Sequence, residues 1–270
     1  MISENNLRSI AKLYKSDKLE HGYIEIYDQY FKNIRNKELK ILEIGIADGR
    51  SLLTWSDYFK NSIIIGIDIH KINTAEKKLN RNNIKVHKGS QSDEKFINEI
   101  TKQYRSFDII IDDGSHLAKD VKKSFNLLFP YLNNNGLYVV EDMQTSYNHF
   151  FGGNPFDLKY SNSHMNFFKH LTDSLNYQEI ANPFYIKNKY DSKITNISFY
   201  HNLVFIKKGI NKNESKEVLN HSYEKMKYKE KSNRSGKFFR YYFKYMVLYK
   251  AYTYFLFSLN LIKKIILFRY

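Results

Sequence analysis

The chain has 270 residues, 42% of them hydrophobic and 16% aromatic, which is enough apolar material for a sizeable core. It contains no cysteine, and this excludes disulfides, thiolate nucleophiles and cysteine-ligated zinc or iron–sulfur centres. The formal charge of +15 indicates either an acidic partner or a lysine-rich solvated surface. The first residues lack the apolar stretch of a secretory signal, so we expect a cytoplasmic protein.

Residues 1–35 have the pattern of amphipathic helices, interrupted by a polar break. The break contains Ser16-Asp17-Lys18 followed by His21 and Tyr23. It has two interpretations, an ordinary cap and loop or a lid whose polar groups close over a cofactor. The segment by itself does not choose between them, and we expect residues 1–35 to form an N-terminal helical lid.

A strand, a glycine-containing turn, a helix and a second strand follow between residues 40 and 68. The first strand ends in the turn at Gly45, and the second, SIIIGID, ends at Asp68. This is a βαβ arrangement of the dinucleotide-binding type, in which glycines let a ligand approach the backbone and a terminal acid binds ribose hydroxyls.

A third strand, NIKVHKG, leads to a polar loop at Ser90 and Gln91. In a nucleoside-binding fold these two side chains would lie beside the adenine. The alternative is a simple helix N-cap, with Ser92 or Asp93 capping the helix that follows. Both interpretations can hold together.

Two later strands end in acids. The stretch FDIIIDDGSH places Asp112 and Asp113 at the end of a buried strand, and GLYVVED ends in Glu141 and Asp142. If the strands are neighbours, Asp113, Glu141 and Asp142 converge, and a hard divalent cation would relieve their repulsion. The alternative is that one acid caps a helix, one binds a cofactor and one is merely solvated.

His116 follows Asp113 by three residues and is the candidate general base. An imidazole can remove a proton from a hydroxyl near neutral pH, and a neighbouring cation would ease that step. A histidine after a strand can also serve only as a capping or hydrogen-bonding residue.

The remaining pattern completes a Rossmann-like α/β fold. After the fifth strand–helix unit, ITNISFY and NLVFIKK flank His201-Asn202 and predict a closing antiparallel hairpin. We expect a mostly parallel seven-stranded sheet over residues 36–210. The polar insertion at residues 143–183 is expected to bind the acceptor substrate.

Several of these motifs together resemble known enzymes. EIGIADG resembles motif I of class I methyltransferases, which bind S-adenosylmethionine (SAM), with Ala47 where a glycine is often found. The combination of GSQSD, FDIIIDDGSH and GLYVVEDMQTSY resembles the metal-dependent sugar O-methyltransferases of the macrocin and mycinamicin type. The resemblance covers about residues 15–207.

The resemblance implies a role for each matching residue. His116 would be the general base, and Asp113, Glu141 and Asp142 would bind Mg²⁺ or another hard divalent cation. The residues expected around SAM are Glu43, Gly45, Asp68, Ser90, Gln91 and Asp112. The acceptor would be a sugar hydroxyl.

Residues 211–270 form a predicted basic, aromatic helical tail. From residue 236 onward it contains no acid, and apolar residues recur at roughly helical spacing between lysines and arginines. This favours a helix lying on an anionic membrane surface, which would place the protein at the inner face of the cell membrane. The alternative is a helix packed on the domain or on a second subunit of a homo-oligomer.

The leading hypothesis is a sugar O-methyltransferase acting in capsular or other surface polysaccharide biosynthesis. The alternatives are a macrolide-type natural-product sugar O-methyltransferase, an RNA methyltransferase and a non-enzymatic SAM-type scaffold. No RNA-binding module is visible, so we expect no nucleic-acid partner.

Overall fold

The computed structural model describes residues 6–70, 79–180 and 185–212. The compact unit that contains them runs from Met1 to Asn213. The predicted tail lies outside the described part of the chain from residue 213 onward. Within the described residues, no helix is both long enough and apolar enough to cross a membrane.

A seven-stranded sheet with the order β3-β2-β1-β4-β5-β7-β6 forms the centre of the unit. Pairing is parallel from β3 to β5, and β7 runs antiparallel to both β5 and β6. The predicted Rossmann-like sheet with its closing hairpin is thereby confirmed. The strands are β1 (Lys40–Ile44), β2 (Ile63–Asp68), β3 (Ile84–Lys88), β4 (Phe107–Asp112), β5 (Leu132–Val140), β6 (Ile194–Tyr200) and β7 (Leu203–Lys208).

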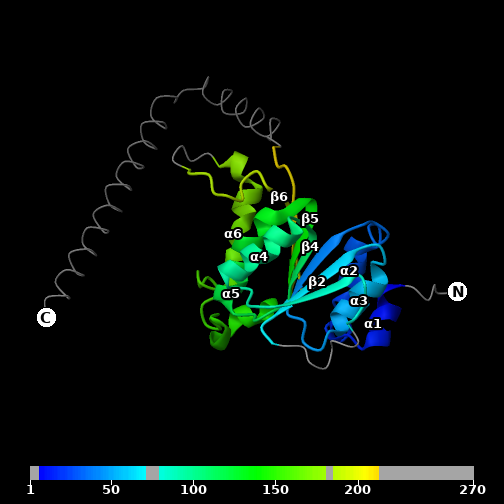
Figure 1. Ribbon diagram of the computed structural model, residues 1–270. Helices are drawn as coiled ribbons and strands as arrows, with labels where there is room; N and C mark the ends of the chain where they lie inside the picture. Colours follow the sequence, from blue (N-terminus) through cyan, green and yellow to red (C-terminus); the bar gives the residue numbers. More distant parts are fainter. Residues whose placement is uncertain (1–5, 71–78, 181–184, 213–270) are drawn as a thin grey trace, which may run out of the picture. The chain divides into compact units, whose positions relative to one another are not determined.

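Helices cover both faces of this sheet (Figure 1). One face carries α1 (Leu7–Tyr14), α2 (Ile24–Phe31) and α3 (Arg50–Tyr58). The other face carries α4 (Glu94–Tyr104), α5 (Ala118–Leu128) and α6 (His164–Leu175). Short 3₁₀ turns connect these elements: Asp17–Leu19, Phe129–Tyr131, Met143–Tyr147, His149–Phe151 and Tyr177–Glu179.

The isoleucine runs explain why the central strands are buried on both faces. Side chains alternate along a strand, so Ile109 and Ile111 of β4 enter the cluster beneath α3. Ile110, between them, enters the opposite cluster with α5. A continuous apolar run is therefore typical of a strand in the middle of a parallel sheet.

The N-terminal helices belong to this core. Tyr27 and Phe31 of α2 are fully buried, and both rings contact Trp55 of α3, with centroid distances of 5.1 and 5.8 Å. Tyr27 also contacts Phe205 of β7. These helices cover one face of the sheet, and a lid movement of residues 1–35 stays a prediction.

The strand β5 begins earlier than the sequence pattern predicts. The apolar stretch GLYVVED begins at residue 136, but β5 starts at Leu132. The register with β4 shifts between Phe107 and Ile109, and Asn133 donates a 2.8 Å hydrogen bond to Asp108 there. The asparagines thus lie at an irregularity inside β5. The hydrophobic periodicity of the sequence alone does not predict it.

Candidate active site

The carboxyl ends of β1, β2, β4 and β5 meet at one edge of the sheet, next to a cavity of about 760 Å³. Parallel sheets bind their ligands at this edge. Seven of the ten predicted site residues line the cavity: Gly45, Asp68, Ser90, Gln91, Asp113, His116 and Asp142. Glu43, Asp112 and Glu141 do not line it.

Gly45 lets the end of β1 pass close to the end of β4. Its φ is +83°, and an added Cβ would lie 2.0 Å from the carbonyl oxygen of Asp113. A side chain therefore fits neither the backbone conformation nor the space. The close approach fixes the floor of the cavity between the two strand ends.

Asp68 supports the turn that follows Gly45. Its Oδ2 accepts hydrogen bonds from the backbone N–H groups of Ile46 (2.8 Å) and Ala47 (3.3 Å), and its Oδ1 accepts one from His70. A carboxylate has about four acceptor positions, so Asp68 retains capacity for a ligand hydroxyl. Ala47 has φ +46°, in the region that favours glycine, which fits its place in a motif that often has glycine there.

Gln91 connects two loops at the cavity wall. Its side-chain N–H donates to Asp112 (2.9 Å), and its oxygen accepts from the backbone N–H of Ser115 (2.7 Å). Ser90 lies 3.2 Å from Ser92, oxygen to oxygen. The alternative role of this loop is also present, because Asp93 caps α4 by accepting from the N–H groups of Lys95 and Phe96.

Asp112 points away from the cavity into the core beneath α5. It is 1% exposed and accepts hydrogen bonds from Gln91, Ser124 and Tyr138. Burial raises the pKa of Asp112 to about 6, against the opposing effect of these hydrogen bonds. In this arrangement the carboxylate joins β4, β5 and α5.

Glu43 is likewise enclosed, under α3. Ser51 and the Trp55 indole N–H donate to its two oxygens, at 2.8 and 3.2 Å. Burial raises the pKa of Glu43, and the nearby Lys18 ammonium opposes the rise. Glu43 therefore lies behind the cavity wall.

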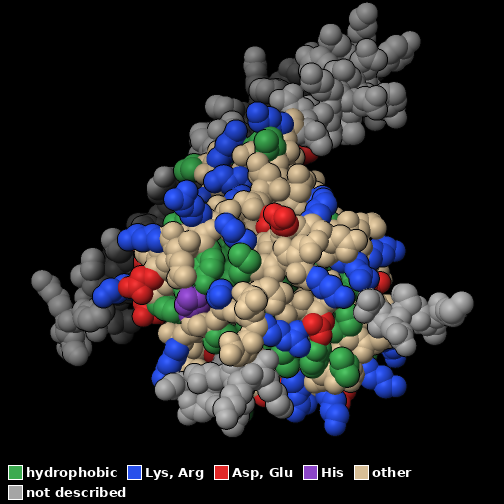
Figure 2. Space-filling view, turned by 45° about the vertical axis from the view of Figure 1, so that its right-hand side comes forward, with side chains coloured by type: hydrophobic (Ala, Val, Ile, Leu, Met, Phe, Trp, Pro, Cys, Tyr) green, Lys and Arg blue, Asp and Glu red, His purple; other side chains and the backbone are tan. Residues whose placement is uncertain are grey.

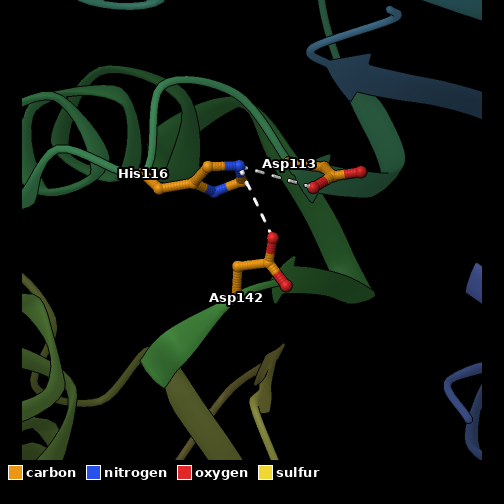
Figure 3. A group of neighbouring side chains, drawn as sticks. All are labelled: Asp113, His116 and Asp142. Carbon is orange, nitrogen blue, oxygen red and sulfur yellow. Dashed lines mark ion pairs between the residues drawn. The ribbon is translucent and has the colours of Figure 1, made fainter. Parts of the chain in front are cut away.

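Asp113, His116 and Asp142 face one another at the cavity (Figure 3). His116 Nε2 lies 3.6 Å from Asp142 Oδ2 and 4.0 Å from Asp113 Oδ1. One ligand atom from each residue falls within 4.8 Å of the others. The three side chains are about one-fifth exposed, which leaves them open to a ligand.

Two of these residues have strained backbones. His116 has φ +56° and Asp142 has φ +54°, left-handed values that cost a residue with a side chain about 1–3 kcal/mol. The surrounding structure maintains both conformations. Such strain is typical of functional sites, and here it occurs at two side chains that face each other.

Glu141 points toward Lys18 and does not line the cavity. Its Oε1 accepts hydrogen bonds from Lys18 Nζ and from the Tyr27 hydroxyl, both at 2.6 Å. Burial and the charge of Asp113 raise the pKa of Glu141, while Lys18 and Tyr27 oppose the rise. Of the three predicted metal ligands, the structure brings Asp113 and Asp142 together with His116 and places Glu141 beside Lys18.

The sequence analysis did not assign Lys18, Tyr23 or Tyr27 to the site. Lys18 is 1% exposed, and its Nζ also lies 2.6 Å from Asp113 and 3.4 Å from Glu43. Burial alone would lower the pKa of Lys18, but Asp113, Glu141 and Glu43 raise it well above its ordinary value. Tyr23 donates a 2.9 Å hydrogen bond to Asp142. The polar break at residues 16–23 was the available signal.

The chemistry of this group fits a hard divalent cation. Asp113 Oδ1 and Asp142 Oδ2 are carboxylate oxygens that face the same space, and oxygen ligands are those that Mg²⁺ and Mn²⁺ prefer. A ring nitrogen beside two carboxylates also suits a base whose proton is transferred next to a bound cation. The cavity beside them is large enough for a nucleoside-sized cofactor.

Comparison with known proteins gives the class first. Residues 42–143 match the family model described as a methyltransferase domain, and the topology above is the mixed seven-stranded sheet of that class. This chain is therefore a protein of the class I methyltransferase fold, with the strand-end motifs in the expected order.

The particular relatives are O-methyltransferases. The chain is 37% identical over 199 residues to demethylmacrocin O-methyltransferase of Streptomyces fradiae, covering 71% of this chain and 49% of that protein. It is 35% identical over 199 residues to mycinamicin VI 2''-O-methyltransferase of Micromonospora griseorubida, with the same coverage of both chains. The resemblance to the macrocin and mycinamicin type is confirmed.

A solved structure agrees. The MycE methyltransferase of the mycinamycin biosynthetic pathway, in complex with Mg and SAH, has a TM-score of 0.72 and 32% identity to this chain. The match covers 81% of this chain and 60% of MycE. The chain spans about half the length of the curated relatives it matches.

Proposed function

We propose that this protein is a SAM- and Mg²⁺-dependent O-methyltransferase that methylates a hydroxyl group of a sugar. One observation carries the proposal. The cavity that places Gly45, Asp68 and Gln91 along its wall also contains His116 facing Asp113 and Asp142. The residues proposed to bind the cofactor and those proposed to transfer the proton thus line the same cavity.

The protein's part in the reaction is alignment and proton removal. The sulfonium of SAM already activates its methyl group, so the chain needs to hold an acceptor oxygen in line with the methyl carbon. His116 Nε2 takes the hydroxyl proton as the new C–O bond forms and the C–S bond breaks. Asp113 and Asp142 would hold the divalent cation, which lowers the pKa of the acceptor hydroxyl when bound.

The residues after β5 would bind the acceptor. The Phe151 ring centroid lies 6.5 Å from that of His116, and Phe150, Phe156 and Leu158 nearby in sequence are 78%, 96% and 64% exposed. Aromatic rings exposed beside a polar site suit an acceptor with an apolar face, such as a deoxysugar on a hydrophobic aglycone.

The nature of the relatives favours a glycosylated small molecule as acceptor. The curated relatives are named for macrolide and tetracenomycin substrates, and this supports the macrolide-type alternative better than our leading expectation of a polysaccharide. The face shown in Figure 2 does not favour RNA as the acceptor. Lys and Arg side chains lie at many places on the face shown in Figure 2, between acidic and uncharged ones.

A methyl-transfer assay tests the proposal. The protein is incubated with isotopically labelled SAM and one of three acceptors: a glycosylated macrolide with a free sugar hydroxyl, a capsular polysaccharide fraction, or total RNA. Each is run with Mg²⁺ and with EDTA. We expect Mg²⁺-dependent label on the macrolide sugar. Label on RNA, or transfer that is unaffected by EDTA, would contradict the proposal.

A further inference from the structure

The N-terminal segment holds each of the three acids at the ends of β4 and β5. Lys18 donates to Asp113 Oδ2 and Glu141 Oε1, and Tyr27 donates to the same Glu141 oxygen. Tyr23 donates to Asp142 Oδ1. The 3₁₀ turn Asp17–Leu19 and the start of α2 thus reach across to the strand ends.

In both Asp113 and Asp142, the two carboxylate oxygens have different partners. Asp113 uses Oδ2 for Lys18 and keeps Oδ1 toward His116. Asp142 uses Oδ1 for Tyr23 and keeps Oδ2 toward His116. One oxygen of each carboxylate is therefore held from the N-terminal side, and the other remains free to face a ligand in the cavity.

Lys18 is the only one of these donors that carries a charge. Its ammonium contacts three carboxylates in a region where Lys18, Glu43 and Glu141 are each at most 3% exposed. Buried carboxylates this close repel one another strongly unless a cation lies between them. The Lys18 ammonium is such a cation, and it is present without any metal ion.

We propose that Lys18 is a built-in counter-ion and positioning residue, which holds Asp113 and Glu141 in place before a divalent cation binds. Its relation to the metal rests on the proposed function, but its role in the metal-free protein does not. Lys18 keeps the carboxylate cluster formed without metal. The cation then meets an ordered site, so binding does not include the cost of ordering the ligands.

The test measures thermal stability of the full-length protein in EDTA and in saturating Mg²⁺. Lys18→Met keeps the length of the side chain and removes its charge. In EDTA we expect the Tm to fall by more than about 6 °C, because breaking a buried ion pair is strongly destabilising. Added Mg²⁺ should raise the Tm of Lys18→Met more than that of the wild type, since the cation replaces the lost charge.

A double variant separates charge from packing. Lys18→Met/Glu141→Gln removes one of the repelling carboxylates together with the ammonium, so it should recover at least half of the Tm lost by Lys18→Met in EDTA. Lys208→Met is the matched control, because Lys208 Nζ donates to the carbonyl oxygens of Phe129, Pro130 and Leu132 and lies over the Phe129 ring. Its Tm should respond to Mg²⁺ as the wild type does.

Three results would overturn the role of Lys18: a Lys18→Met protein that melts in EDTA within about 2 °C of the wild type, a double variant with no recovery, or a Tm that Mg²⁺ raises by the same amount in Lys18→Met and wild type. If Lys18→Met does not fold in EDTA, folding of the double variant supports the role and its failure rejects it. If neither protein responds to Mg²⁺, the proposed metal is wrong, and the results in EDTA alone decide on Lys18.

Discussion

The Cα of Gly45 lies so close to the Asp113 carbonyl that a Cβ on Gly45 would come within 2.0 Å of the carbonyl oxygen. This contact joins the ends of β1 and β4, on which the cofactor wall and the base are built. Gly45→Ala combines the cost of a left-handed backbone with a backbone clash. We expect it to lower the free energy of unfolding by about 3 kcal/mol or more in a chemical denaturation experiment.

Gly22 provides the matched control for that substitution. Its φ is +72°, but nothing lies within 4 Å of an added Cβ. Gly22→Ala should therefore show only the backbone cost, about 1–2 kcal/mol. Equal losses in the two variants would show that the close approach at Gly45 is not tight in solution.

His116→Gln tests the base. Glutamine can form hydrogen bonds at this position but cannot accept the proton, so the rate of methyl transfer should fall by about 10²–10⁴-fold. SAM affinity, measured by calorimetry, should be unchanged because His116 lies on the acceptor side of the proposed reaction. His201→Gln, at the turn of the β6–β7 hairpin, should keep full activity. An active His116→Gln enzyme would remove the proposed mechanism.

Asp142→Asn tests the metal site. The amide oxygen can still accept the hydrogen bond from Tyr23, but the charge near Asp113 is lost. The Mg²⁺ concentration needed for half-maximal activity should rise by at least about tenfold. Asp157→Asn, in the insertion at residues 143–183, is the control, because the Asp157 carboxylate accepts a hydrogen bond from the backbone N–H of Lys159; it should leave the requirement unchanged. Equal requirements in both variants would contradict the assignment of Asp142.

The convergence of the strand ends was predictable because it follows from topology. The isoleucine runs identify β2 and β4 as buried strands, and parallel strands bring their carboxyl ends to one edge. The predicted pairing of the strand before Asp113 with the strand before Glu141 is confirmed by the β4–β5 register. From this alone it follows that the acids at the ends of these two strands lie at one edge of the sheet.

The direction of each acid was not predictable in the same way. Asp112 and Asp113 are adjacent, and so are Glu141 and Asp142, yet in each pair one side chain enters the protein and the other faces the cavity. Adjacent residues point to opposite sides of a strand, so the choice depends on where the strand ends. The contact between Lys18 and Asp113 spans 95 residues, and no local pattern in the sequence specifies it.

The tail at residues 236–270 lies outside the described residues, and its membrane role stays a prediction. We expect the full-length protein to float with anionic liposomes at low salt. Reversing two charges with Lys263→Glu/Lys264→Glu should reduce the bound fraction by at least about tenfold, since each basic residue near the surface contributes about 1 kcal/mol. Lys187→Glu/Lys189→Glu controls for net charge. Equal binding by both double variants would argue against docking through the tail.

The lowered pKa of His164 predicts how the free energy of unfolding depends on pH. It is fully buried at the start of α6, and burial lowers its pKa from 6.5 to about 4. A histidine with a lowered folded-state pKa stays neutral in the fold but is protonated in the unfolded chain, so stability is present above pH 6.5 and falls as the pH drops toward 4. Between pH 7.5 and pH 5 the wild type should lose about 2 kcal/mol more than His164→Leu, which cannot titrate. Denaturation curves of the two proteins at both pH values measure this difference, and parallel losses would show that His164 is protonated in the folded protein.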